Sequence, residues 1–155
     1  MLGTLTERYS MASVTVLLRA PPGVEGRIVS GTVSPSGRPG GTGTYMQKFS
    51  LQAMARELLD RARNAGGGRA ASTVIGGHEK TLRQTVIAMV KGAVLREHEN
   101  PGEASVHVLA GRVRLAAGQD SWDGRSGDLL VVPDTAHTLE ALEDSAILLT
   151  VAKLA

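Results

Sequence analysis

From Ala70 onward, apolar and polar residues alternate with a period of two, and glycine-containing turns interrupt the alternation at short intervals. Such alternation is typical of half-buried β-strands. It predicts nine strands, at residues 73–75, 82–90, 93–98, 105–109, 113–116, 120–122, 129–132, 138–141 and 146–152. Gly111 lies between two of them, at a tight hairpin that requires a positive φ. Many short strands without crossover helices predict an antiparallel sandwich or barrel.

One segment has the period of a helix instead. Residues 50–64 carry apolar side chains at helical spacing, starting at Leu51, and charged residues occupy the opposite face. Ser50 is a suitable N-cap, and the glycines at 66–68 end the helix. The pattern predicts an amphipathic helix packed on the outside of the barrel, with a partner-binding helix as the alternative.

The chain divides into three parts by composition. Residues 1–45 are rich in Gly, Pro, Ser and Thr and are expected to be a disordered N-terminal tail. Met46 resembles a natural start, so the tail is a possible mis-assigned extension, testable by mass spectrometry of the native N-terminus. Residues 46–69 then form a helix and linker, and residues 70–155 form the barrel domain.

Composition and charge exclude several classes of function. The 155 residues include no cysteine, which excludes a disulfide framework, a thiolate metal site and a cysteine nucleophile. No apolar run approaches the roughly 18 residues that span a bilayer, and no secretory signal is recognisable, so we expect a cytoplasmic protein without membrane contact. The formal net charge of +2 comes from residues 1–45. Without a basic face, and with 3% aromatic residues, direct nucleic-acid binding is not expected.

Residues 92–137 carry the spacing of a known pair of motifs. Gly92 is followed after five residues by His98, and Gly111 closes the first motif. Gly127 and Pro133 begin the second, and His137 follows one residue early. In these features the chain resembles the small single-domain cupins. The resemblance implies an all-β double-stranded β-helix, or jelly roll, with both motifs facing its interior.

In cupins two histidines and a glutamate of the first motif and one histidine of the second usually bind a divalent metal. Carried over by position, His98 and His137 survive, Asn100 replaces the second histidine, and Ala104 replaces the glutamate. The resemblance therefore implies a degenerate site of His98, His137, Asn100 and, with a register shift, Glu103. Zn, Fe, Mn or Ni would be the metal.

Strand parity is compatible with this set. Residues 98, 100 and 104 share one face of a regular strand, whereas His107 has the opposite parity and is expected to face outward. Two histidines and an amide oxygen are a poor ligand set, since such metals usually take three or more imidazole or carboxylate ligands. The alternative is that both histidines are hydrogen-bonded pocket residues without metal.

Two functions remain open at this point. The first is a small-molecule-binding or sensing barrel, either metal-free or with weak metal binding. The second is a metal-dependent enzyme of the dioxygenase, isomerase or decarboxylase type. Because exposed sheet edges invite pairing, a homodimer is expected. Trp122 fits outer packing or an interface better than a ligand-stacking platform.

Overall fold

The computed structural model describes residues 47–77, 79–98 and 102–153. The expected tail at 1–45, Met46 and Asn100 lie outside these ranges. The described part is mostly β, as the alternation predicts, with one helix before the strands. The elements in chain order are α2 (Leu51–Arg63), β1 (Arg69–Ile75), β2 (Leu82–Met89), β3 (Val94–His98), β4 (Gly102–Ala110), β5 (Arg112–Ala117), β6 (Asp120–Arg125), β7 (Leu129–Val132), β8 (His137–Ala141) and β9 (Ser145–Lys153).

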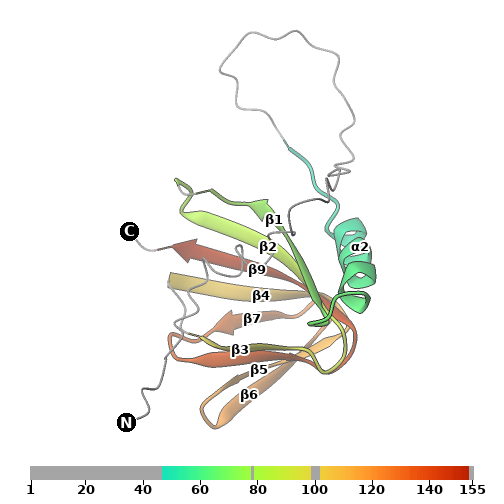
Figure 1. Cartoon of the computed structure of the whole chain (residues 1–155). Coiled ribbons are helices and arrows are strands. Elements are labelled where there is room, and N and C mark those ends of the chain that lie inside the picture. Colours follow the sequence, from blue (N-terminus) through green and yellow to red (C-terminus); the bar gives the residue numbers. More distant parts are fainter. Residues whose placement is uncertain (1–46, 78, 99–101, 154–155) are drawn as a thin grey trace, which may run out of the picture.

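The strands form two antiparallel sheets that face each other. One sheet has the order β1-β2-β9-β4-β7 and the other the order β3-β8-β5-β6. Figure 1 shows the five-stranded sheet above the four-stranded one, with α2 beside their shared end. Consecutive strands mostly lie in different sheets, so the chain crosses the sandwich repeatedly. This connectivity confirms the predicted jelly roll.

Alternation of buried and more exposed residues, clearest in β4, shows where the core lies. In β4, Ala104, Val106 and Val108 are buried between the sheets, while the intervening residues are more exposed. The same side of the other strands supplies Met89, Val113 and Ile147, which are almost completely buried. His107 lies between two buried valines and therefore occupies the outer face, as its parity predicts.

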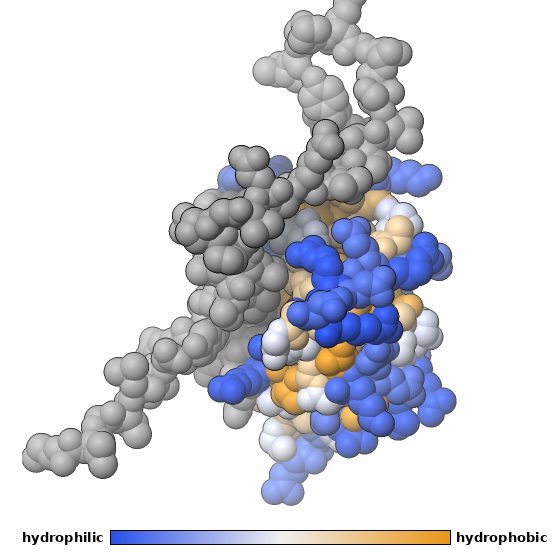
Figure 2. Space-filling view, turned by 45° about the vertical axis from the view of Figure 1, so that its right-hand side comes forward, coloured by the Kyte–Doolittle hydropathy of each residue, from blue (hydrophilic) through white to orange (hydrophobic). Residues whose placement is uncertain are grey.

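The helix covers part of the outer face of the five-stranded sheet. Ser50 caps it by accepting a hydrogen bond from the Ala53 amide at 3.3 Å. Leu58 and Ala62 are buried against Val86 and Leu148 of the sheet, which confirms the predicted packing of this helix. Figure 2 brings the side of α2 forward and shows hydrophilic side chains over most of this face, with apolar area between them. No helix within the described ranges is long and apolar enough to cross a membrane.

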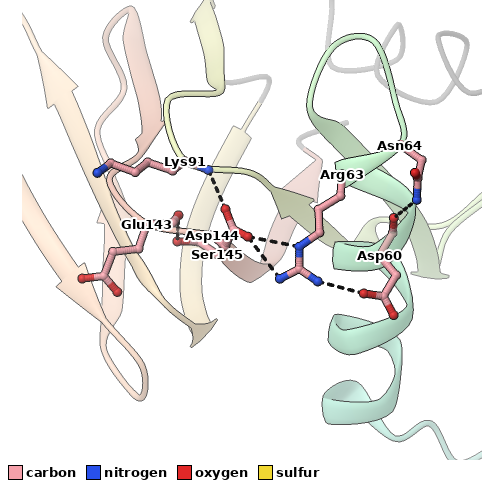
Figure 3. A network of polar contacts seen from close by, with 7 residues as sticks. All are labelled: Asp60, Arg63, Asn64, Lys91, Glu143, Asp144 and Ser145. Carbon is pink, nitrogen blue, oxygen red and sulfur yellow. Dashed lines mark hydrogen bonds and ion pairs between the residues drawn. The ribbon is translucent and has the colours of Figure 1, made fainter.

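A polar network ties the C-terminal end of α2 to the barrel (Figure 3). Asp144, in the β8–β9 turn, accepts hydrogen bonds from the Lys91 amide at 2.9 Å and from two Arg63 nitrogens at 3.1 and 3.2 Å. Arg63 also binds Asp60 of its own helix at 2.8 Å. The Lys91 amide and the Arg63 guanidinium lower the pKa of Asp144 below its ordinary value. The network therefore fixes the helix at one end of the barrel.

Candidate functional site

The two ends of the barrel differ in what they carry. The connections β2–β3, β4–β5, β6–β7 and β8–β9 lie at one end, because Lys91 and Gly111 both approach Asp144 and the Gly127 amide bonds to the end of β4. The connections β5–β6 and β7–β8 lie at the opposite end, together with the end of β1 and the starts of β2 and β4. We call this opposite end the mouth; it is where β3 ends at His98 and β8 begins at His137.

His137 is the buried polar residue of the mouth. Its exposed fraction is 4%, and its Nδ1 lies 2.8 Å from the Thr135 carbonyl oxygen. A carbonyl oxygen can only accept, so Nδ1 carries the proton and donates it to Thr135. In the neutral imidazole Nε2 then carries the lone pair and is the ring's acceptor. Hydrogen bonding to the backbone thus fixes the tautomer of His137.

The interior next to His137 is apolar and almost full. A cavity of about 20 Å³ lies there, enough for roughly one water molecule. Apart from His137, its lining is aliphatic and comes from both sheets: Leu95, Val106, Leu115, Val132, Leu139, Ile147 and Leu149. The imidazole of His137 is therefore the polar side chain among the residues that line this cavity.

The backbone brings together the two histidine positions that the sequence singles out. In the β3–β8 pair, His98 is the register partner of His137, after an irregularity that follows Leu95. The two positions are thus neighbours across strands although they are far apart in sequence. The side chain of His98, like Asn100, lies outside what the structure describes.

The other expected ligand positions in β4 place no metal-binding side chain beside His137. Ala104, at the glutamate position, is 9% exposed and belongs to the apolar core. Glu103 is exposed and alternates with the buried residues on either side of it, so it lies on the outer face of β4. Among the described side chains no group of three or more His, Cys, Asp and Glu could hold a metal ion. The described donors therefore do not make up the ligand set usual for a cupin metal.

Arg83 is a mouth residue that the sequence pattern does not reveal. It lies one residue inside the mouth end of β2, and its Nε is buried without a hydrogen-bond partner. One terminal nitrogen donates to the Gly77 carbonyl oxygen at 3.3 Å. The feature of the sequence that points to Arg83 is its spacing: it lies four and six residues before Ile87 and Met89, so it shares a strand face with these core residues.

Other charged residues have structural partners away from the mouth interior. Asp123 on β6 accepts from Arg114 Nε at 2.7 Å and also from Arg112, both on β5. Hydrogen bonds from Arg114 and Arg112 lower the pKa of Asp123. Trp122, the neighbour of Asp123, is 74% exposed. These residues lie on strands β5 and β6 of the four-stranded sheet and do not line the cavity beside His137.

Comparison with known proteins supports the fold from independent structures. No family model and no curated protein matches the sequence. Among solved structures, a conserved protein of unknown function from Streptococcus pyogenes aligns with a TM-score of 0.53 and 27% identity, over 59% of this chain and 79% of its own. A cupin superfamily protein from Desulfitobacterium hafniense aligns with a TM-score of 0.52 and 15% identity, over 56% and 78%. An RmlC-like cupin from Shewanella frigidimarina aligns with a TM-score of 0.51 and 20% identity, over 57% and 79%.

The chain therefore has the fold of these small cupins, a double-stranded β-helix.

Proposed function

We propose that this protein binds a small molecule at the mouth of its barrel and does so as a binding or sensing protein. The observation that carries the proposal is His137, a buried imidazole with a fixed tautomer in an otherwise aliphatic lining. An apolar cavity with few polar groups is the usual form of a small-ligand site. His137 Nε2 would accept a hydrogen bond from the ligand and orient it.

The size of the cavity limits which part of a ligand reaches His137. About 20 Å³ accommodates a group the size of a water molecule, such as a hydroxyl or an amide N–H. The bulk of the ligand would then lie in the mouth, outside the closed core. We therefore expect recognition of a small hydrogen-bond donor at the tip of the ligand.

A metal-dependent enzyme of the dioxygenase, isomerase or decarboxylase type is the second candidate. One arrangement favours it: His98 pairs with His137 across the strands, and a backbone carbonyl orients the His137 ring as is common for metal-binding histidines. Zn, Fe, Mn or Ni would be held by His98 and His137, with Asn100 and water, since Glu103 lies on the outer face of β4. Ala104 and the outward position of Glu103 favour weak binding over a catalytic centre.

Metal content separates the two candidates. We would purify the full chain without a histidine tag or chelator and measure its metals by elemental analysis. Metal well below one ion per chain, at the same level in His137→Gln, is the result expected for the binding protein. One ion per chain that disappears in His137→Gln would overturn that proposal in favour of the metal-dependent enzyme.

Ligand binding is tested with a panel of small alcohols and amides, followed by amide NMR signals of the cavity residues Leu139 and Leu149. We expect panel members to shift these signals in the native chain and in His107→Gln, but not in His137→Gln. His107 is a matched control because it lies on the outer face. Shifts that persist in His137→Gln, or that no panel member produces, would refute the proposal.

Pairing of two copies through a sheet edge is proposed as well. Strand β1 is the last strand of its sheet and pairs on one side only, with β2, in the described structure. An open edge of seven residues invites pairing with a second chain. Light scattering at micromolar concentration should therefore give the mass of a dimer, and a monomer mass would contradict the pairing.

A further inference from the structure

We infer that the mouth recognises the carboxylate group of a small organic acid through Arg83. The inference rests on the proposed function, since it names the class of ligand for the same mouth. Inside the barrel, Ile87 and Met89 of β2 are core residues, and Arg83 continues the same strand face toward the mouth. Its register partner on β9 is Val151, which is also in the core. The arginine therefore borders the interior.

The guanidinium group of Arg83 has unused hydrogen-bonding capacity. Its Nε is buried and has no acceptor, and the Gly77 carbonyl takes only one terminal nitrogen, at 3.3 Å. Among the described residues, Arg63 and Arg114 each bind a carboxylate, whereas no ion pair is formed by Arg83. A buried donor without an acceptor costs free energy, because it has lost its hydrogen bonds to water. A ligand oxygen would remove that cost.

Arg112 provides an internal comparison. Its Nε is also buried without a hydrogen-bond partner, but its terminal nitrogen forms an ion pair with Asp123. The positive charge of Arg112 is thus compensated within the protein. Glu79 is the acidic residue closest in sequence to Gly77, whose carbonyl oxygen accepts from Arg83. The Glu79 carboxylate lies beside Gly77 but forms no ion pair with Arg83 within 4.0 Å. The charge of Arg83 is left for a ligand.

A second positive charge lies on the same side of the sheet. Lys153 follows Val151 by two residues on β9, so it is the diagonal cross-strand neighbour of Arg83 on the interior-facing side. Lys153 is exposed at the mouth end, where it pairs with Gly102 of β4. Two cations beside an aliphatic interior favour an anionic ligand over a neutral one.

The shape of the guanidinium favours a carboxylate among anions. Its planar donors match the two oxygens of a carboxylate, and such charge-assisted hydrogen bonds are among the strongest in proteins. Arg83 would hold the carboxylate at the rim, while His137 receives a small donor group in the cavity beyond. The ligand class is therefore a short acid that carries a hydrogen-bond donor, such as a hydroxy acid.

The experiment uses ω-hydroxy acids of increasing length, beginning with glycolate, and the neutral amide of each as its matched control. Binding to the full chain is followed by the NMR signal of the Arg83 Nε–H group at about 0.15 M salt, which screens exposed charges. We expect the acids to shift this signal and the amides to leave it unchanged. Equal shifts from acid and amide would overturn the inference.

Variants assign the effect to Arg83. Because variants of Arg83 lack its Nε–H group, their binding is followed by the backbone amide signals of Val151 and Lys153, the neighbours of Arg83 on β9. Arg83→Gln should weaken acid binding by roughly 10- to 100-fold, the equivalent of losing charge-assisted hydrogen bonds. Arg83→Lys keeps the charge without the planar fork and should recover only part of the affinity. Arg56→Gln, on the exposed face of α2, should bind like the native chain. Unchanged affinity in Arg83→Gln, or equal loss in Arg56→Gln, would refute the role of Arg83.

His137→Gln separates this inference from the proposed function. An acid response at Arg83 that is insensitive to His137→Gln would leave the carboxylate site in place and remove the proposed role of the cavity. Binding of small alcohols that depends on His137, without any acid response at Arg83, would support the proposed function and overturn the carboxylate site. Retention of the amide spectrum in each variant shows that the barrel is folded.

Discussion

Replacing Gly111 by alanine tests how tightly the β4–β5 hairpin is built against the β8–β9 turn. Gly111 has φ +76°, a conformation that costs an L-residue about 1–2 kcal/mol. A Cβ at this position would also lie 2.5 Å from Ser145 Oγ and 2.9 Å from Ser145 Cα, and closer still to the Asp144 carbonyl oxygen. These atoms belong to backbone and to a fully buried side chain, so they cannot move independently.

Relief of that contact would disturb two hydrogen bonds. Ser145 Oγ accepts from the Arg112 amide at 3.0 Å and lies 2.7 Å from the Glu143 carbonyl oxygen, to which it can donate. Each is worth about 1 kcal/mol. Together with the backbone strain, we expect Gly111→Ala to lower the free energy of unfolding by roughly 3–4 kcal/mol.

Gly118→Ala is the matched control for strain alone. Gly118 has φ +58°, and a Cβ there would meet nothing within 4 Å. It should cost only about 1–2 kcal/mol. The effect of alanine on the unfolded chain is common to both variants and cancels in the difference. Urea denaturation of both variants measures the two losses, and equal losses would refute the packing argument.

Three further predictions concern the helix network, the tail and the histidines. Asp144→Asn should cost at most about 1 kcal/mol, because the carboxylate is partly exposed; a larger loss in thermal melts would mean that the network is a principal source of stability. A backbone amide and Arg63 lower the pKa of Asp144 from 3.8. The stability that the Asp144 carboxylate contributes is therefore present above pH 3.8 and lost as the pH falls below it. The native and Asp144→Asn chains should then converge in stability at acid pH. Deletion of residues 1–45 should leave a cooperative melt, and its loss would show that the segment is structural. His98→Ala combined with His137→Ala should remove any metal uptake while the circular dichroism spectrum stays native, whereas retained uptake would place the metal elsewhere.

Local patterns carry enough information for the elements of this fold. Strands such as β4 and β8 alternate because one face is buried, and the helix has both an N-cap at Ser50 and a distinct apolar stripe. The positive φ of Gly111 also follows from its place between two strands. These features depend on neighbours within a few residues, which is why the sequence predicts them.

The site depends on contacts that no local pattern records. Arg83 reads as an ordinary polar position in its strand, and only the pairing of β2 with β9 brings Lys153 beside it. The volume next to His137 depends on how aliphatic side chains from both sheets interlock. Asp144 likewise meets Arg63 only because the β8–β9 turn folds back on the helix. The pairing of positions 98 and 137 agrees with what the motif spacing implies, whereas their chemistry stays a prediction.

The place of β9 in its sheet has a consequence for how the protein reaches this structure. β9 lies between β2 and β4 in the sheet but follows both of them in the sequence. Leu82, at the start of β2, thus pairs with Ala152, near the end of the chain. During synthesis β2 and β4 emerge without the strand that separates them, and at about 5–20 residues per second they wait seconds for it. Until then, their apolar faces and hydrogen-bonding edges are open to wrong partners. Such long-range pairing makes folding slow for the size of the barrel, so correct assembly during translation depends on how these early strands are shielded.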